Sequence, residues 1–297
     1  MKFKKLIDLQ IFAGGHELRE RYSALVDKKF RKSLKTAYCF NGRYEGSPKA
    51  GAVNLVVRDT EVATGDYDKK TGGELGTSST TYLKILVDKD KYVNELIDGY
   101  EAAAVPDGIV ADRLDSAGYS MALALDSDGV TCLETEGTAL ENTTALTKST
   151  VYDSFVDTRT KLSDTGVPEE GRFALVTPHT YGLILKSPEF IKASALGDAV
   201  VQTGALGKIA GFLIYETNNL SSTTEYVAGH RDWCHRVEEW SVPVAINDLK
   251  DGKHIGASAV QGRKVYAHKV SKKEAVLVKK NAATQNTSDQ GGAEGNA

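Results

Sequence analysis

The sequence has 297 residues, of which 41% are hydrophobic and 26% charged, so it is long enough and apolar enough to bury a sizeable core. No apolar run reaches the roughly 18 residues that a membrane-spanning helix needs, and we expect no membrane contact. The three cysteines, Cys39, Cys132 and Cys234, are odd in number and widely spaced. This pattern is typical of free thiols in a reducing compartment, so we expect synthesis in the cytosol.

Basic residues are concentrated in the first part of the chain. Residues 1–45 contain eleven Lys or Arg and five Asp or Glu, whereas the remainder contains 26 basic and 35 acidic residues. A basic arm on an acidic body can bind nucleic-acid phosphates or dock on the acidic surface of a neighbouring copy. A solvated helix face is an equally good interpretation of the basic residues Lys28, Lys29, Arg31, Lys32 and Lys35.

Two predicted strands follow, separated by an unusually long polar connection. Val53 to Val57 and Tyr82 to Val87 are rich in β-branched residues, and the 23 residues 58–80 between them are mostly Gly, Thr, Ser, Asp and Lys. A connection of this length is rare inside a compact domain unless it is functional or extends outward. We therefore predict a projecting β-arm, with a disordered surface insertion as the alternative.

Lys89 to Asp128 is predicted to be the main helical region, with a kink or restart at Pro106. After this proline, apolar residues recur at helical spacing: Val110, Leu114, Ala117, Met121, Ala124 and Leu125. Such a stripe favours a long helix with one face packed on a sheet. Residues 134–148 are polar and rich in Thr, and we interpret them as a linker.

The second half of the chain predicts a mixed sheet with helices. Thr150-x-x-Asp153 is typical of a capping box, with Val151, Phe155 and Leu162 on one face of a helix that ends by Gly166. The remaining predicted elements are strands at Arg172 to Thr177, Phe212 to Glu216, Glu225 to Gly229, Gly262 to Val270 and Ala275 to Val278, and a helix beginning at Pro178. Residues 281–297 have almost no apolar side chains beyond alanine, which predicts disorder.

Two stretches resemble chemical sites in part. His230, Cys234 and His235 could meet on a helix face and bind a metal, but no second cluster supplies further ligands, and ordinary packing of Trp233, Cys234 and Trp240 is favoured. Gly204 to Gly211 lacks the spacing of a phosphate-binding loop and has Ile209 at the hydroxyl position, so it is interpreted as a turn. We expect no catalytic, cofactor-binding or metal-binding residues, no cofactor and no enzymatic activity.

The order of these elements, and the run G-x-x-G-K-I-x-G-F-x-I-Y-x-T-N-N-L that starts at Gly204, resembles the major capsid proteins of tailed bacteriophages. G-x-K-V-Y at Gly262 is similar to their chain ending. The resemblance implies an α+β subunit with the Hong Kong 97-type fold. Its parts would be an N-terminal arm at 1–45, an E loop at 46–88, a P domain with a spine helix at 89–148, an A domain at 149–247, return strands of the P domain at 248–280 and a disordered tail at 281–297.

The resemblance also implies a function. Copies of the chain would self-assemble as pentamers and hexamers into an icosahedral shell, the virion capsid, built in the bacterial host cytoplasm around double-stranded DNA. The short N-terminal region predicts a separate scaffolding protein, and a portal is the other expected partner. Two alternatives stay open: an encapsulin-like nanocompartment shell with protein cargo, and a small metal-binding enzyme that uses His230, Cys234 and His235.

Overall fold

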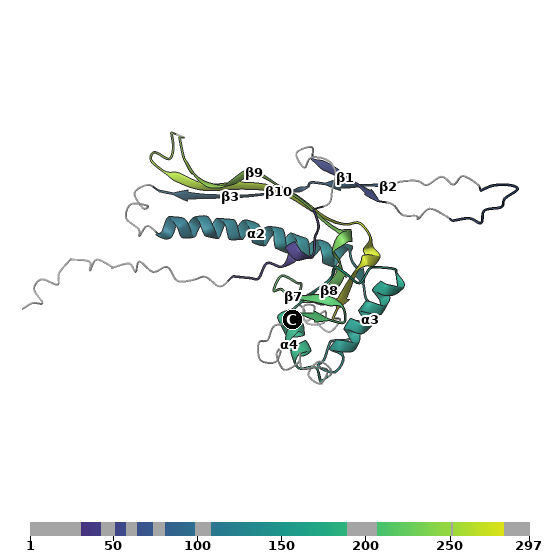
Figure 1. Ribbon diagram of the computed structural model, residues 1–297. Helices are drawn as coiled ribbons and strands as arrows, with labels where there is room; N and C mark the ends of the chain where they lie inside the picture. Colours follow the sequence, from purple (N-terminus) through teal and green to yellow (C-terminus); the bar gives the residue numbers. More distant parts are fainter. Residues whose placement is uncertain are drawn as a thin grey trace, which may run out of the picture.

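The computed structural model describes residues 31–42, 51–57, 64–73, 81–98, 108–188, 207–250 and 252–281. The chain is a mixed α and β protein with two parts (Figure 1). An elongated part contains a two-stranded arm and a three-stranded sheet beside a long helix, and a compact part contains a six-stranded sheet with two helices. Within the described residues, none of the helices combines the length and the apolar character that crossing a membrane would require.

The two strands of the arm are confirmed. β1 (Ala52–Val57) pairs antiparallel with β2 (Thr81–Leu86), in a register that places Val53 opposite Ile85. In Figure 1 the arm lies at one end of the elongated part, and the three-stranded sheet extends toward the other end. The described residues 64–73 lie beyond the arm. Residues 58–63 and 74–80 of the predicted connection lie outside the described residues.

The three-stranded sheet has the order β3-β10-β9, and both pairings are antiparallel. Its strands are β3 (Lys89–Ile97), β10 (Ser258–Val270) and β9 (Cys234–Asp248). The helix α2 (Gly108–Glu136) runs along one face (Figure 1), where Ala117 packs with Ile97 and Val260. The predicted apolar stripe therefore does pack on a sheet, with Ala117, Met121 and Leu125 buried.

The predicted helical region from Lys89 to Asp128 was wrong at both ends. Lys89–Ile97 is a strand, because Val93 and Ile97, four residues apart, satisfy a strand period as well as a helical one, and β10 supplies the pairing partner. The helix continues beyond Asp128 to Glu136, so the predicted linker begins inside it. Pro106 lies outside the described residues.

Gly129 lies inside α2 at a point where side chains pack closely on the helix backbone. A Cβ there would lie 3.2 Å from side-chain atoms of Arg236, His268 and Phe40, so the missing side chain lets these three groups approach the helix backbone. Close approach is one of the uses of glycine that outweighs its low helix propensity.

The six-stranded sheet has the order β4-β11-β8-β5-β7-β6. Its strands are β4 (Thr138–Ala139), β11 (Val276–Lys280), β8 (Thr224–His230), β5 (Arg172–Val176), β7 (Phe212–Glu216) and β6 (Lys208–Ile209). The pairings β5–β7 and β11–β4 are parallel and the others antiparallel. This confirms the strands predicted around Arg172, Phe212, Glu225 and Ala275, with small shifts at their ends, and the strand predicted at Gly262 is β10 of the three-stranded sheet, which begins earlier, at Ser258.

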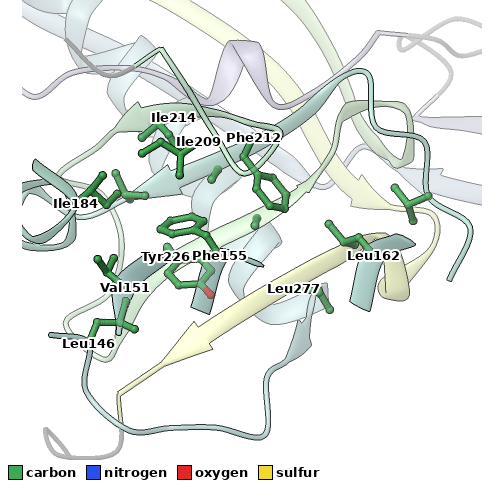
Figure 2. Packing of buried hydrophobic residues seen from close by; sticks show 14 of the residues in the cluster. Leu146, Val151, Phe155, Leu162, Ile184, Ile209, Phe212, Ile214, Tyr226 and Leu277 are labelled. Atoms are coloured by element: carbon green, nitrogen blue, oxygen red, sulfur yellow. The ribbon is translucent and has the colours of Figure 1, made fainter. Parts of the chain in front are cut away.

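The helix α3 (Val151–Asp164) buries its predicted face on this sheet, and α4 (Pro178–Leu185) begins at the predicted proline. The ring of Phe155 stacks on that of Tyr226 at a centroid distance of 4.6 Å, and Figure 2 shows both rings at the centre of the core. The predicted capping box was wrong in its mechanism. Thr150 is the N-cap, but its hydroxyl accepts from the Thr147 amide instead of capping α3.

The turn predicted before Phe212 is confirmed for the residues that are described. Ala210 and Gly211 have φ of 46° and 90°, and they connect Ile209 to Phe212 in a tight antiparallel hairpin. Two consecutive positive φ angles are the signature of a type I′ hairpin turn. Residues 204–206 lie outside the described residues.

The strand β9 was not predicted from the sequence. Pro243 lies within it, which is unfavourable in a central strand, and the pairing with β10 shows register shifts between Gln261 and Lys264. The proline is tolerated because β9 is an edge strand of its sheet. The predicted disordered tail, apart from Asn281, and most of the predicted basic arm lie outside the described residues.

Candidate assembly surfaces

His230, Cys234 and His235 do not share a helix face, so that premise of the metal interpretation was wrong. His230 ends β8, a single 3-10 turn (Arg231–Trp233) follows, and Cys234 begins β9. His230 Nε2 contacts the Glu170 carbonyl, and the two ring nitrogens of His235 lie 3.0 Å from Asn41 Oδ1 and 3.2 Å from Ser271 Oγ. No group of three potential metal ligands occurs among the described residues.

The three cysteines are free, as predicted, and none is activated as a nucleophile. Burial raises the pKa of Cys39 and of Cys234 well above the usual range, and it raises the pKa of Cys132 to about 12. A thiol needs a lowered pKa to react as a thiolate near neutral pH. The cysteines therefore serve as buried packing groups between the first described segment, α2 and β9.

The arm formed by β1 and β2 has one buried face and one exposed face, on which apolar side chains flank the polar pair Asn54 and Lys84. Val53 and Ile85 pack on Val237 and Ala267 of the three-stranded sheet. On the other face, Tyr82 is 67% exposed and Leu86 60% exposed, and Val56 is also exposed. A strand pair with apolar side chains on both faces needs a partner on each face, so the outward face is a candidate interface.

The three-stranded sheet has a second candidate interface on the face away from α2. Tyr92 of β3 lies opposite Arg263 of β10, which lies opposite Val242 of β9. Tyr92 is 76% exposed, Val242 is exposed as well, and Arg263 forms an ion pair with Asp90. An exposed tyrosine beside an arginine and apolar side chains has the composition of a protein–protein interface core.

The first described segment, residues 31–42, lies against α2 and ends at β9. Arg31 pairs with Asp115 and stacks on the ring of Tyr119, with 4.8 Å between the guanidinium carbon and the ring centroid. Asn41 forms a parallel β-bridge with His235, and its backbone N–H donates to the Cys234 carbonyl at 2.8 Å. Residues 31–42 are thus docked on their own subunit, which neither predicted alternative described, and Lys28 and Lys29 lie outside the described residues.

Sequence reasoning missed the polar cluster under this segment. Asp126 is 3% exposed, although it lies next to Leu125 at the end of the predicted apolar stripe. An acidic residue at the margin of such a stripe was the available signal, and only the fold shows that Thr36, Arg236 and Asn219 surround it.

Comparison with known proteins agrees with this geometry. The sequence model of a family described as phage capsid protein matches residues 86–278. A structure from Mycobacterium phage Che8 is 21% identical with a TM-score of 0.72, and the alignment covers 89% of this chain and 97% of that one.

Two further capsid structures are similar at low sequence identity. The capsid structure of the cyanophage P-SCSP1u is 13% identical with a TM-score of 0.75, covering 89% of this chain and 92% of that one. The capsid of an empty GTA particle is 13% identical with a TM-score of 0.67, and the alignment covers 93% of this chain and 100% of that one. No curated protein matches the sequence.

Proposed function

This chain belongs to the phage capsid protein family, and from that premise we propose that its copies assemble as pentamers and hexamers into the icosahedral head of a tailed bacteriophage. It has the Hong Kong 97-type capsid fold and is a structural subunit of a head shell, not an enzyme. The proposed content of the shell is double-stranded DNA, held by non-specific contacts.

The observation that carries the proposal is the exposed apolar face of the β1–β2 arm. Tyr82 and Leu86 project from a two-stranded element that is too thin to bury them within its own subunit. In a shell, the outward face of a neighbour's three-stranded sheet offers a complementary surface, with Tyr92 and Val242 exposed there. Burying roughly 150–250 Å² for each aromatic side chain would make these residues the main energetic contributors.

We propose the following division of the chain: N-terminal arm at 1–45, E loop at 46–88, P domain at 89–148, A domain at 149–247, return strands at 248–280 and tail at 281–297. The pairing of β9 with β10 favours one revision, which assigns residues 234–248 to the P domain. A separate scaffolding protein and a portal are the proposed partners, and assembly is proposed to occur in the host cytoplasm.

The direct test is negative-stain electron microscopy of the expressed chain, alone and with the neighbouring genes. Shells, or rings of five and six subunits, support the proposal, and DNA instead of protein cargo inside them separates a phage head from a nanocompartment. A strictly monomeric product under both conditions overturns it.

A variant series makes the test specific to the arm. Replacing Tyr82 and Leu86 by serine is expected to leave the subunit folded and abolish shells. Val156→Ser is the matched control, since Val156 is an exposed apolar residue of α3, distant in sequence from the arm. Shells of normal yield from the arm variant contradict the proposed role of this face.

A further inference from the structure

We propose that residues 31–42 form a strap that exchanges between a docked and an undocked state, and that the buried carboxylate of Asp126 and the partly buried guanidinium of Arg236 make this exchange possible. In the docked state the Thr36 hydroxyl bridges the two charges. In the undocked state they form a direct ion pair. The strap is a property of a single subunit, so it goes beyond the proposed assembly function and is testable without it.

The bridge is defined by three short hydrogen bonds. Thr36 donates its amide and its hydroxyl to Asp126 Oδ1 at 2.9 and 2.8 Å, and its hydroxyl oxygen accepts from Arg236 Nη2 at 2.6 Å. Thr36 is 1% exposed and Asp126 is 3% exposed. One side chain of the strap thus separates a carboxylate on α2 from a guanidinium on β9 inside the protein.

The rest of the strap is held unevenly along its length. At one end, Arg31 and Lys32 make solvent-exposed contacts with Asp115 and Tyr119, and exposed pairs of this kind contribute little. Near the other end, the Phe40 ring is buried under the Arg236 guanidinium at 5.0 Å. The docked state is therefore favoured by the C-terminal half of the strap, and undocking begins at its exposed N-terminal end.

A direct pair of Asp126 and Arg236 explains why undocking does not leave an unpaired charge with a large free-energy penalty. Asp126 Oδ1 and Arg236 Nη2 both bond the same hydroxyl oxygen, so they are no farther apart than the sum of the two distances, 5.4 Å. A buried charge without a partner is strongly destabilising, whereas a small rotation of the arginine side chain would pair these two directly. Each state thus satisfies both charges, which is the requirement for a two-state element.

The strap also connects the two parts of the molecule. Asp126 Oδ2 accepts from Asn219 Nδ2 at 2.7 Å, and Asn219 lies between β7 and β8 of the six-stranded sheet. The same carboxylate therefore contacts the strap, α2 and the compact part. Rearrangement of Asp126 on undocking would loosen the contact between the elongated and compact parts.

Hydrogen exchange of the purified full-length chain, before any shell assembly, tests the switch. The readouts are the amides of Cys39 and Asn41, which donate to the carbonyls of Thr36 and Cys234. Thr36→Val removes the bridging hydroxyl and is expected to accelerate hydrogen exchange at both amides at least tenfold, because hydrogen bonds to charged groups are lost. Thr36→Ser keeps the hydroxyl and is expected to stay within about twofold of the parent.

A second substitution tests the direct ion pair. Adding Asp126→Asn to Thr36→Val removes the carboxylate of the direct ion pair in the undocked state and leaves the Arg236 guanidinium on the Phe40 ring, so hydrogen exchange at the Cys39 and Asn41 amides is expected to slow at least threefold relative to Thr36→Val alone. Equal or faster exchange overturns the direct pair. The amide of Ala228 in β8, fully buried, reports whether each variant remains folded.

If Thr36→Val does not fold, Tyr119→Phe is the substitute, because it removes only the exposed hydroxyl that accepts from the Lys32 amide at 2.6 Å. It is expected to accelerate hydrogen exchange at the Cys39 and Asn41 amides about threefold and to leave exchange at the Ala228 amide unchanged. Unchanged exchange at both strap amides in a folded Thr36→Val or in Tyr119→Phe overturns the strap, as does equal acceleration by Thr36→Val and Thr36→Ser.

Discussion

Acidification is expected to destabilise the subunit through His268. This side chain is mostly buried, and its Nε2 accepts a hydrogen bond from Arg236 Nε at 2.9 Å, which requires the neutral imidazole. Burial, together with the positive charge of Arg236, lowers the pKa of His268 from 6.5 to about 3. Protonation would break the hydrogen bond and place a second cation beside a buried one.

The sign and size of the effect follow from proton linkage. The unfolded chain binds the proton near pH 6.5 and the folded chain only near pH 3, so the stabilisation is complete above pH 6.5 and is lost as the pH falls toward 3. Between pH 7 and pH 5 the expected loss is about 2 kcal/mol, because each pH unit below the unfolded pKa contributes about 1.4 kcal/mol.

The assay is urea unfolding of the parent and of His268→Gln at pH 7 and pH 5. Glutamine can still accept from Arg236 but does not titrate, so the variant is expected to lose about 2 kcal/mol less than the parent on acidification. The difference between the two proteins isolates His268 from the other histidines. Equal losses in both would refute the assignment of this pH dependence to His268.

Three further predictions concern packing, the helix and the arm. Phe155→Ala is expected to lower the free energy of unfolding by about 3–5 kcal/mol, because Phe155 is fully buried, whereas the exposed neighbour Val156→Ala should change it by less than about 0.5 kcal/mol in urea unfolding. In α2, Gly118→Ala is expected to raise the melting temperature, since its Cβ meets nothing within 4 Å and alanine favours helix by roughly 0.5–1 kcal/mol, but Gly129→Ala should lower it because of the three contacts at 3.2 Å. A melting temperature raised by both glycine replacements would contradict the close packing at Gly129. Deleting Asp66 to Ser79 is expected to leave a cooperatively folded subunit that forms no stable shells in electron microscopy, and normal shells from this variant would refute the arm assignment.

The predictions that were confirmed depend on local sequence patterns that are compatible with only one type of secondary structure. Phe155 and Leu162 at helical spacing, the apolar run from Phe173 to Val176, and the proline at the start of α4 each determine their element within a few residues. The order of these elements, together with the motif that starts at Gly204, indicated the capsid fold through its resemblance to known capsid proteins. The domain boundaries stay a proposal.

The predictions that failed concern segments in which two structures fit the same pattern. Val93 and Ile97 are compatible with helix and strand, and only pairing with β10 decides for the strand. The strand β9 was not predicted, and it accommodates Pro243 because it lies at a sheet edge, which only the pairing of the strands decides. The capping box at Thr150 failed because a nearer amide competed for the same hydroxyl.

The sequence by itself determined the spacing of apolar residues, and through it the helices and most strands, while the resemblance of its motifs and element order to tailed-phage capsid proteins indicated the family. Only the tertiary structure decided which polar residues are buried and what they bond. Asp126, Thr36 and Arg236 are separated by 90 residues or more along the chain, and no local pattern connects them. Their contact depends on α2, β9 and the first segment meeting at one point. A buried charge is tolerated only where such distant partners converge.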